Sequence, residues 1–491
     1  MIGLSLAEIA AVTGGRVDGI DGKLLVDGPV VVDSREVVPG ALFVAVPGER
    51  VDGHDFAAAA VEAGAKAVLA TRPVGVPAVI VSDTVEALGE LAGLVVRRLA
   101  EEADLAVVGV TGSQGKTSTK DLIASVLETH GTTIAPPGSF NNEIGLPLTA
   151  LRANSLTRFL VMEMGARGIG HVRYLCDIAP PRIGVVLNVG LAHVGEFGSR
   201  EAIARAKGEL VEALPADGLA VLNADDPLVA AMAARTSARV LTYGLGSGAG
   251  GPDIAATDVV LDGEGRARFT LRTPDGTAEV ALGLHGAHHV INSLAAAAVA
   301  HELGMRTSAI AAALSAATPR SRWRMEVTTR PDGVTVVNDA YNANPDSMRA
   351  ALNALVAIAG ERRSWAVLGE MRELGESSAV EHDAVGRLVA DMNISRLVVV
   401  GDGARAAHAG ALGARAWADA PVFVADADAA AALLTKELAP QDVVLVKASR
   451  AAGLERVAAA LLEGPPVRER SEPNKHSGLT SHSAERSEVF E

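Results

Sequence analysis

Two adjoining stretches decide the fold of this chain: "DLAVVGV" (104–110) and "TGSQGKTSTK" (111–120). The first is a near-continuous apolar run, which is typical of a parallel strand covered on both faces. The second leads into "TSTKDLIASVLETHG", where apolar residues recur at helical spacing before a glycine stop at Gly131. A buried strand, a glycine-bearing turn and a helix start together predict an anion site, because backbone N–H groups and the helix dipole point into the turn.

The turn departs from the strict phosphate-loop pattern, which places glycine where this chain has Val110. Gly112 and Gly115 still allow a tight backbone. Lys116 can reach the terminal phosphates of a nucleotide, and the Thr117 hydroxyl is placed to ligate Mg²⁺. A chance Gly-Lys-Thr between a buried strand and a helix is improbable, so we expect nucleotide binding. The predicted contacts in this loop are Thr111, Gly112, Ser113, Gln114, Gly115, Lys116, Thr117 and Ser118.

Two residues further along the chain are candidate partners for the cation. Glu163 ends the apolar run in "FLVMEMGA", and His193 lies in "NVGLAHVGEFGS", just past another predicted strand. In doubly wound sheets the carboxyl ends of the strands line the ligand crevice, so both residues are expected to face the phosphates. Either residue taken alone could be an exposed loop residue.

The composition limits the class of protein. A net charge of −15 without a long basic run argues against nucleic acid or anionic membrane as a partner. The single cysteine, Cys176, rules out an internal disulfide. The N-terminal stretch carries Glu8 and no basic region, and residues 280–301 contain several histidines and glycines, which makes them a poor membrane span. These features predict a cytoplasmic protein that does not insert into a membrane.

The pattern of elements divides the 491 residues into three predicted domains and a tail. Residues 1–102 combine short strands, turns and a helix. Residues 103–318 alternate strand and helix, as in a right-handed doubly wound sheet, with an antiparallel insert or side sheet at 252–284. Residues 319–465 contain a second α/β sheet, and the polar, aperiodic segment 466–491 is predicted to be a disordered tail.

Five motifs follow one another along the chain from the phosphate loop onward: "TGSQGKTSTK", "VMEMGA", "NVGLAHVGEFGS", "AKGEL" and "HVINSLAAA". Together they resemble the ATP-binding core of the Mur ligases, the amide-bond-forming enzymes of peptidoglycan synthesis. In that family the loop is T-G-x-x-G-K-T, so Val110 fits the pattern. The resemblance implies an α/β, three-domain architecture with a UDP-substrate-binding N-terminal domain, a central P-loop domain and a Rossmann-like C-terminal domain. It also implies ATP as the nucleotide, a carboxylate activated as an acyl phosphate, and ADP as product.

Four further stretches narrow the resemblance within the family: "DSREVVPGALFVAVPGERVDGHDF", "GSFNNEIGLPLTAL", "NDAYNANPDSM" and "VLGEMRELGESS". They resemble the family member that adds D-Ala-D-Ala to UDP-N-acetylmuramoyl-tripeptide and gives the pentapeptide. The D-N-P-R motif expected of the preceding ligase does not occur in the sequence. The resemblance therefore implies these two substrates and a monomer, and it leaves open whether the third peptide residue is lysine or diaminopimelate.

Carried over position by position, the resemblance implies further contacts. Those to the UDP end, the muramoyl-peptide and the rest of the substrate are Ser34, Arg35, Asn142, Glu143, Lys447 and Ser449. Those to ATP beyond the loop are Asn292, Arg324, Asp339 and Asn342. Departures from the family pattern occur at Ala340, Ala448 and His289. For His288 and His289, a packed structural role and contact with a ligand are equal alternatives.

Lys207, in "ARAKGELVEAL", has two interpretations. A lysine on an amphipathic helix is usually solvated. The resemblance instead implies a carbamylated lysine, whose carboxylate helps to hold the second of two Mg²⁺ ions beside His193. The implied metal-binding residues are thus Thr117, Glu163, His193 and Lys207, and the implied catalytic residues are Lys116, Glu163, His193 and Lys207.

Three alternatives remain at this point. Another Mur-type ligase would share the whole architecture, and folylpolyglutamate synthetase would share the ATP core but not the "DSR" to "DGH" region. A nucleotide-driven switch protein would hydrolyse ATP slowly and without regard to any amino acid.

Overall fold

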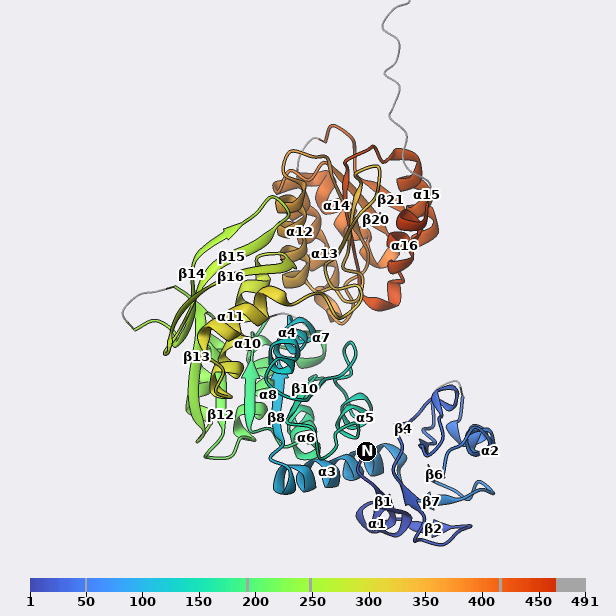
Figure 1. The fold of residues 1–491 in the computed structure, drawn as a ribbon. Helices are drawn as coiled ribbons and strands as arrows, with labels where there is room; N and C mark the ends of the chain where they lie inside the picture. The colour runs from blue at the N-terminus through green and yellow to red at the C-terminus, as the bar shows by residue number, and fades with distance from the viewer. Residues whose placement is uncertain (49–50, 191–193, 247–249, 415–416, 465–491) are drawn as a thin grey trace, which may run out of the picture.

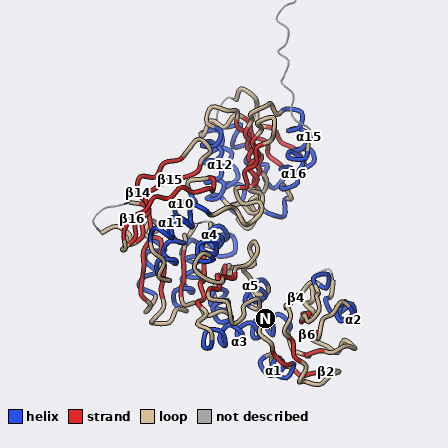
Figure 2. Tube along the Cα trace, in the orientation of Figure 1, coloured by secondary structure: helices blue, strands red, loops and turns tan. Residues whose placement is uncertain are grey.

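Parallel sheets flanked by helices build all three parts of the chain, which Figure 1 shows in blue, in cyan to yellow, and in orange to red. The computed structural model describes residues 1–48, 51–190, 194–246, 250–414 and 417–464. The predicted tail 466–491 and His193 lie outside the described residues. Figure 2 shows the strands at the centre of each part with helices around them, so the predicted α/β class is confirmed.

The N-terminal part holds a five-stranded sheet of order β2-β7-β6-β5-β4, in which only β2 runs antiparallel to its neighbour. A small antiparallel pair, β1 and β3, lies beside it. The strands are β1 (Leu4–Ser5), β2 (Arg16–Asp18), β3 (Leu25–Val26), β4 (Val30–Val31), β5 (Leu42–Val44), β6 (Ala67–Ala70) and β7 (Ala78–Ile80). The helices are α1 (Leu6–Val12), α2 (Ala57–Glu62) and α3 (Thr84–Glu102).

Helix α3 joins this part to the next one. The Asp83 carboxylate caps it by accepting from the backbone N–H groups of Val85 and Glu86, which would otherwise lack partners. Its apolar face, which includes Leu88, Leu91 and other fully buried residues, belongs to a core that continues under the central sheet. In Figure 1 α3 accordingly lies along the base of the central part.

The central part is a nine-stranded sheet of order β16-β15-β14-β13-β12-β11-β8-β10-β9. Its strands are β8 (Ala106–Thr111), β9 (Thr133–Ile134), β10 (Phe159–Glu163), β11 (Ile183–Val186), β12 (Leu219–Asn223), β13 (Arg239–Leu245), β14 (Ile254–Leu261), β15 (Arg266–Thr273) and β16 (Gly276–His285). Its helices are α4 (Lys116–Glu128), α5 (Gly145–Ala150), α6 (His171–Ile178), α7 (Val194–Phe197), α8 (Arg200–Glu212), α9 (Pro227–Ala230), α10 (His288–Glu302) and α11 (Thr307–Ala316).

The antiparallel segment predicted at 252–284 extends the main sheet and is not a separate sheet. β14 pairs in parallel with β13 and antiparallel with β15, which pairs antiparallel with β16, so all four strands belong to one sheet. One face of the sheet packs on α3, α6 and α8, and the other packs on α4, α10 and α11. Within β8, Val107 points to the first face while Val108 and Val110 point to the second, which explains the near-continuous apolar run.

The C-terminal part is a six-stranded sheet of order β17-β18-β22-β19-β20-β21, with only β17 antiparallel. Its strands are β17 (Glu326–Thr329), β18 (Thr335–Asn338), β19 (Ser364–Leu368), β20 (Arg396–Val400), β21 (Val422–Val424) and β22 (Val443–Lys447). Its helices are α12 (Pro345–Ala359), α13 (Ser378–Asp391), α14 (Arg405–Ala414), α15 (Ala427–Glu437) and α16 (Glu455–Glu463). Separate apolar cores form on the two faces, with α12 to α14 on one and α15 and α16 on the other.

Candidate active site

A cavity of about 360 Å³ opens where β8, β10, α4 and α10 of the central part meet the C-terminal part. Most of the residues predicted from the sequence line it, although they come from positions more than 300 residues apart. They are Ser113, Gln114, Gly115, Lys116, Thr117, Ser118, Asn142, Glu163, Lys207, Asn292, Arg324, Asp339, Asn342 and Lys447. The sequence motifs therefore converge on one site.

The phosphate loop has the geometry that the sequence predicts. Gly115 has φ of 79° and a Cβ there would approach Asn292 Oδ1 to 2.9 Å, so both backbone and space require glycine. α4 begins at the next residue, Lys116, whose Nζ donates to the Gly112 carbonyl at 2.7 Å. Burial lowers the pKa of Lys116, and the nearby Glu163 carboxylate offsets part of that effect. The Lys116 ammonium is thus held over the backbone of the loop.

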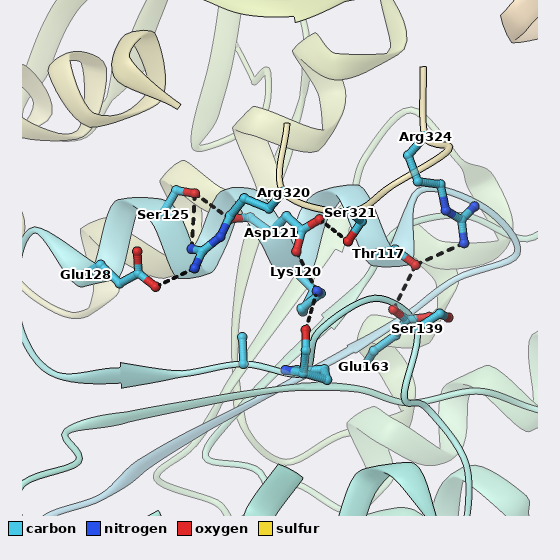
Figure 3. A network of polar contacts seen from close by, with 12 residues as sticks. Thr117, Lys120, Asp121, Ser125, Glu128, Ser139, Glu163, Arg320, Ser321 and Arg324 are labelled. Atoms are coloured by element: carbon cyan, nitrogen blue, oxygen red, sulfur yellow. Dashed lines mark hydrogen bonds and ion pairs between the residues drawn. The ribbon is translucent and has the colours of Figure 1, made fainter. Parts of the chain in front are cut away.

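Hard oxygen atoms gather beside the loop, as Figure 3 shows. The Glu163 carboxylate is 1% exposed and accepts from Thr117 Oγ1 at 2.9 Å. It also accepts from Ser139 Oγ at 2.7 Å and from Asn141 Nδ2 at 2.8 Å. A carboxylate with two hydroxyls next to it is a donor set that suits Mg²⁺, which prefers oxygen ligands. Ser139 and Asn141 were not predicted from the sequence, although the "GSFNNE" stretch (138–143) contains both.

Lys207 lies in the middle of α8 and is 2% exposed, so the solvated alternative is wrong. Among the residues that the structure describes, none forms a hydrogen bond or ion pair with its Nζ. Burial, and next the positive charge of Lys116, hold the pKa of Lys207 well below its ordinary value. Lys207 therefore presents to the cavity an amine whose lowered pKa favours the unprotonated, nucleophilic form.

The start of α10 brings unsatisfied polar atoms to the site. Asn292 is 5% exposed, and in the described chain its Nδ2 has no hydrogen-bond partner. Buried polar groups normally have partners, so this amide is free for a ligand, and it can both donate to and accept from a base edge. His288 lines the cavity, and its ring centroid lies 4.3 Å from that of His289. Burial lowers the pKa of both rings, and that of His289 most strongly.

The C-terminal part contributes a cation and a buried ion pair. Arg324 stacks over the Tyr341 ring at 4.2 Å, and its Nη2 donates to Thr117 Oγ1 at 3.2 Å. Lys447 Nζ lies 2.5 Å from Asp339 Oδ2 and 2.8 Å from the Asn342 carbonyl. Burial lowers the pKa of Lys447, against the opposing effect of Asp339. Tyr341 was not predicted, because its role depends only on the position of Arg324.

The remaining predicted residues lie elsewhere. Thr111 ends β8 and donates to the Met164 carbonyl, and Ser449 accepts from the backbone N–H of Arg372. Ser34 and Arg35 form a short turn in the N-terminal part, where Arg35 lies 2.6 Å from Asp33. That contact lowers the pKa of Asp33 to about 2.

Glu143 lines a second cavity, of about 430 Å³, beside the start of α3. Arg167 and His171 line both cavities, so the second cavity adjoins the main one.

Three family models match the chain in order. The descriptions are "Mur ligase family, catalytic domain" at residues 29–99, "Mur ligase middle domain" at 110–300, and "Mur ligase, glutamate ligase domain" at 323–450. The chain therefore belongs to the Mur ligase family, as the sequence motifs predicted.

Among its curated relatives is the UDP-N-acetylmuramoyl-tripeptide–D-alanyl-D-alanine ligase of Mycobacterium tuberculosis, which is 53% identical over 94% of this chain and 98% of that protein. The ligase of the same name from Escherichia coli is 36% identical over 94% and 99%. Among solved structures, MurF from Acinetobacter baumannii is similar with a TM-score of 0.83 at 32% identity, covering 94% and 99% of the chains. MurF from Thermotoga maritima in complex with ADP is similar with a TM-score of 0.75 at 32% identity, and the match covers 89% of this chain and 97% of that one.

Proposed function

We propose that this protein joins D-Ala-D-Ala to UDP-N-acetylmuramoyl-tripeptide, with ATP converted to ADP and phosphate. The observation that carries the proposal is the near-complete match to ligases of this name, 53% identical over 94% of the chain, combined with a cavity that brings their motifs together. ATP use follows from membership of the family and agrees with a similar structure that holds ADP.

In the first step the terminal carboxylate of the tripeptide attacks the γ-phosphorus of ATP, which forms an acyl phosphate and releases ADP. Two anions must approach each other, so the site has to neutralise negative charge. Lys116 at the loop and Arg324 at Thr117 both line the cavity and supply that charge. In the second step the amine of D-Ala-D-Ala attacks the acyl carbon, and phosphate leaves.

Mg²⁺ fits the donor set around Glu163, and when bound it would neutralise charge on the phosphate oxygens. We propose that Thr117 and Glu163 hold one ion, and that His193 and a carbamate on Lys207 help to hold a second. Support for the carbamate comes from the burial of Lys207 and the lowered pKa of its amine, because only an unprotonated amine adds CO₂. The carbamate would turn an amine, which offers no oxygen, into an anionic oxygen ligand for Mg²⁺.

The remaining substrate contacts and the domain division are also proposals. We assign the UDP end to Ser34 and Arg35, the muramoyl-peptide to Asn142 and Glu143, and the adenine to Asn292. The other contacts assigned to ATP are Thr111, Gly112, Ser113, Gln114, Gly115, Ser118, Asp339 and Asn342. Lys447 and Ser449 are assigned to the rest of the substrate. The proposed domains are 1–102, 103–318 and 319–465, in a cytoplasmic monomer. No described helix is both long enough and apolar enough to cross a membrane.

Phosphate release measured with each substrate omitted in turn tests the function. The proposal requires release to depend on ATP, on a UDP-muramoyl-tripeptide and on D-Ala-D-Ala together. Release without the two acceptor substrates would support a nucleotide-driven switch, and release with folate and glutamate would support folylpolyglutamate synthetase. Running the assay with lysine- and diaminopimelate-containing tripeptides decides which third residue is accepted.

A further inference from the structure

The segment between α11 and β17 runs along α4 in the opposite direction, from the far end of the helix toward the phosphate loop (Figure 3). Three of its side chains make the contacts. Arg320 reaches Glu128 at 2.8 Å, and Ser321 Oγ donates to Asp121 Oδ2 at 2.6 Å. The third side chain is that of Arg324, which reaches Thr117 at the start of the helix. The helix positions are spaced by four and seven residues, so they lie along one face of α4. We call residues 317–325 the strap.

Asp121 holds two different segments at once. Its Oδ2 accepts from Ser321 in the strap, and its Oδ1 lies 2.5 Å from Nζ of the neighbouring Lys120. The Lys120 side chain is 1% exposed and also donates to the Pro136 carbonyl at 2.7 Å. A buried ammonium needs both partners, because an unpaired charge is costly there. Asp121 is thus fixed between the strap and the loop that begins at Pro136.

These contacts close a ring around the candidate metal ligands. Three residues after Pro136 the loop presents Ser139, which donates to Glu163. Glu163 in turn accepts from Thr117, and Thr117 accepts from Arg324 of the strap. Arg324 follows Ser321 by three residues, which leads back to Asp121. Asp121 does not itself line the main cavity, but this ring of contacts connects it to Glu163 and Arg324, which do.

The strap has little freedom of its own between its two anchors. Trp323 and Met325, the residues on either side of Arg324, have φ of 58° and 50°. Such left-handed conformations are unfavourable for large side chains and persist only where the surroundings impose them. One anchor is Ser321 on Asp121, and the other is the Met325 N–H, which donates to Asp339 Oδ1 at 3.1 Å. Between them the Trp323 carbonyl accepts from the Tyr341 N–H at 3.3 Å. The direction of Arg324 therefore depends on the Asp121 anchor together with its contacts to Tyr341.

We propose that Asp121 is a positioning residue for the ligation reaction. Through Ser321 it sets where Arg324 lies at the nucleotide site, and through Lys120 it sets where Ser139 lies at Glu163. The inference rests on the proposed function, since ligation supplies the readout.

The test uses full-length enzyme and begins with Ser321→Ala, which removes the strap contact and leaves the buried pair of Asp121 and Lys120 intact. We expect kcat to fall about 10- to 100-fold, because a displacement of about 1 Å at the reacting groups can cost about 100-fold. The KM for the UDP-tripeptide should stay unchanged. Ser321→Thr keeps the hydroxyl and should restore kcat, while Asp121→Asn should lower kcat further than Ser321→Ala, because it also removes the carboxylate that pairs with Lys120. Glu128→Gln is the matched control on the same helix face, because its contact with Arg320 is exposed and should contribute little.

A double-mutant cycle separates positioning from general stability. If Ser321 acts through Arg324, Ser321→Ala should cause no further loss of kcat in an Arg324→Lys background. Losses that multiply would overturn the proposal, and so would a Ser321→Ala enzyme that melts at a lower temperature with wild-type kcat. If Asp121→Asn fails to fold, the Ser321 variants decide alone. A wild type that ligates nothing contradicts the proposed function, whereas an active wild type with an equally active Ser321→Ala variant contradicts only the positioning role.

Discussion

Replacing Lys207 by methionine should make the protein more stable and, at the same time, inactive. The side chain is 2% exposed and has no partner among the described residues, so methionine of similar length can fill the same space without a polar atom. A buried polar group without a partner costs about 1–3 kcal/mol, so the substitution should raise the free energy of unfolding by about that amount. Each kcal/mol corresponds to about 2–4 °C in Tm for a unit the size of the central part, so Tm should rise by a few degrees.

The pH dependence of this gain has a defined sign. Burial lowers the pKa of Lys207 in the folded chain, so between that pKa and the unfolded value of about 10.4 the unfolded chain binds more protons. The free energy of unfolding of the wild type, measured relative to Lys207→Met, should therefore rise with pH and level off above the unfolded pKa. The advantage of the variant should accordingly be greatest near neutral pH and shrink toward pH 10.

Ligation by Lys207→Met should fall by at least about 100-fold, because the variant cannot supply the proposed metal-binding carboxylate. Denaturant titration and phosphate release, each in CO₂-free and in bicarbonate buffer, measure the two effects. ¹³C-bicarbonate should give the wild type a carbamate resonance that the variant lacks. Lys436→Met, on the exposed face of α15, serves as control and should change neither quantity. A Lys207→Met variant that ligates at the wild-type rate, or that melts at a lower temperature, would refute the reasoning.

Four further outcomes are expected. Lys116→Ala should reduce ligation by at least about 100-fold while calorimetry still detects UDP-tripeptide binding, and loss of that binding would mean that the domain roles are wrong. Arg35→Ala should weaken binding of the UDP-tripeptide and leave binding of ATP unchanged, so an equal loss of affinity for both would contradict the assignment of Arg35 to the UDP end. Cys176 is buried and its pKa is raised to about 12, so native protein at pH 8 should resist iodoacetamide until denaturant is added; rapid labelling would contradict this. Truncation after Pro466 should leave activity and Tm nearly unchanged, and a loss of several degrees would show that the tail packs on the protein.

Much of the nucleotide site could be predicted because its chemistry lies in consecutive residues. The run from Thr111 to Ser118 specifies a strand end, a turn and a helix start, and each depends on local backbone preferences and nearby side chains. The class of fold followed for the same reason, since alternating apolar runs and amphipathic helices admit few arrangements. Family motifs then supplied Arg324, Asp339 and Lys447, which no local pattern could have joined to the loop.

Other features depend on contacts between distant parts of the chain. The prediction of an antiparallel insert or side sheet at 252–284 left two alternatives open, because the sequence does not say which strand pairs with the free edge of β13. Ser139 and Asn141 act through Glu163, which they meet only when the loop folds over β10.

What the sequence by itself determined is therefore the set of elements and the residue types able to bind phosphate. Only the tertiary structure decided which side chains lose water and which partners they find. Lys207 and Lys120 show the difference, because both are lysines on helices and both are buried. Lys120 is paired with a carboxylate and a carbonyl, whereas Lys207 is left beside another cation, which together with burial lowers the pKa of the Lys207 amine. Charge in a protein interior depends on burial and neighbours, and folding alone supplies both.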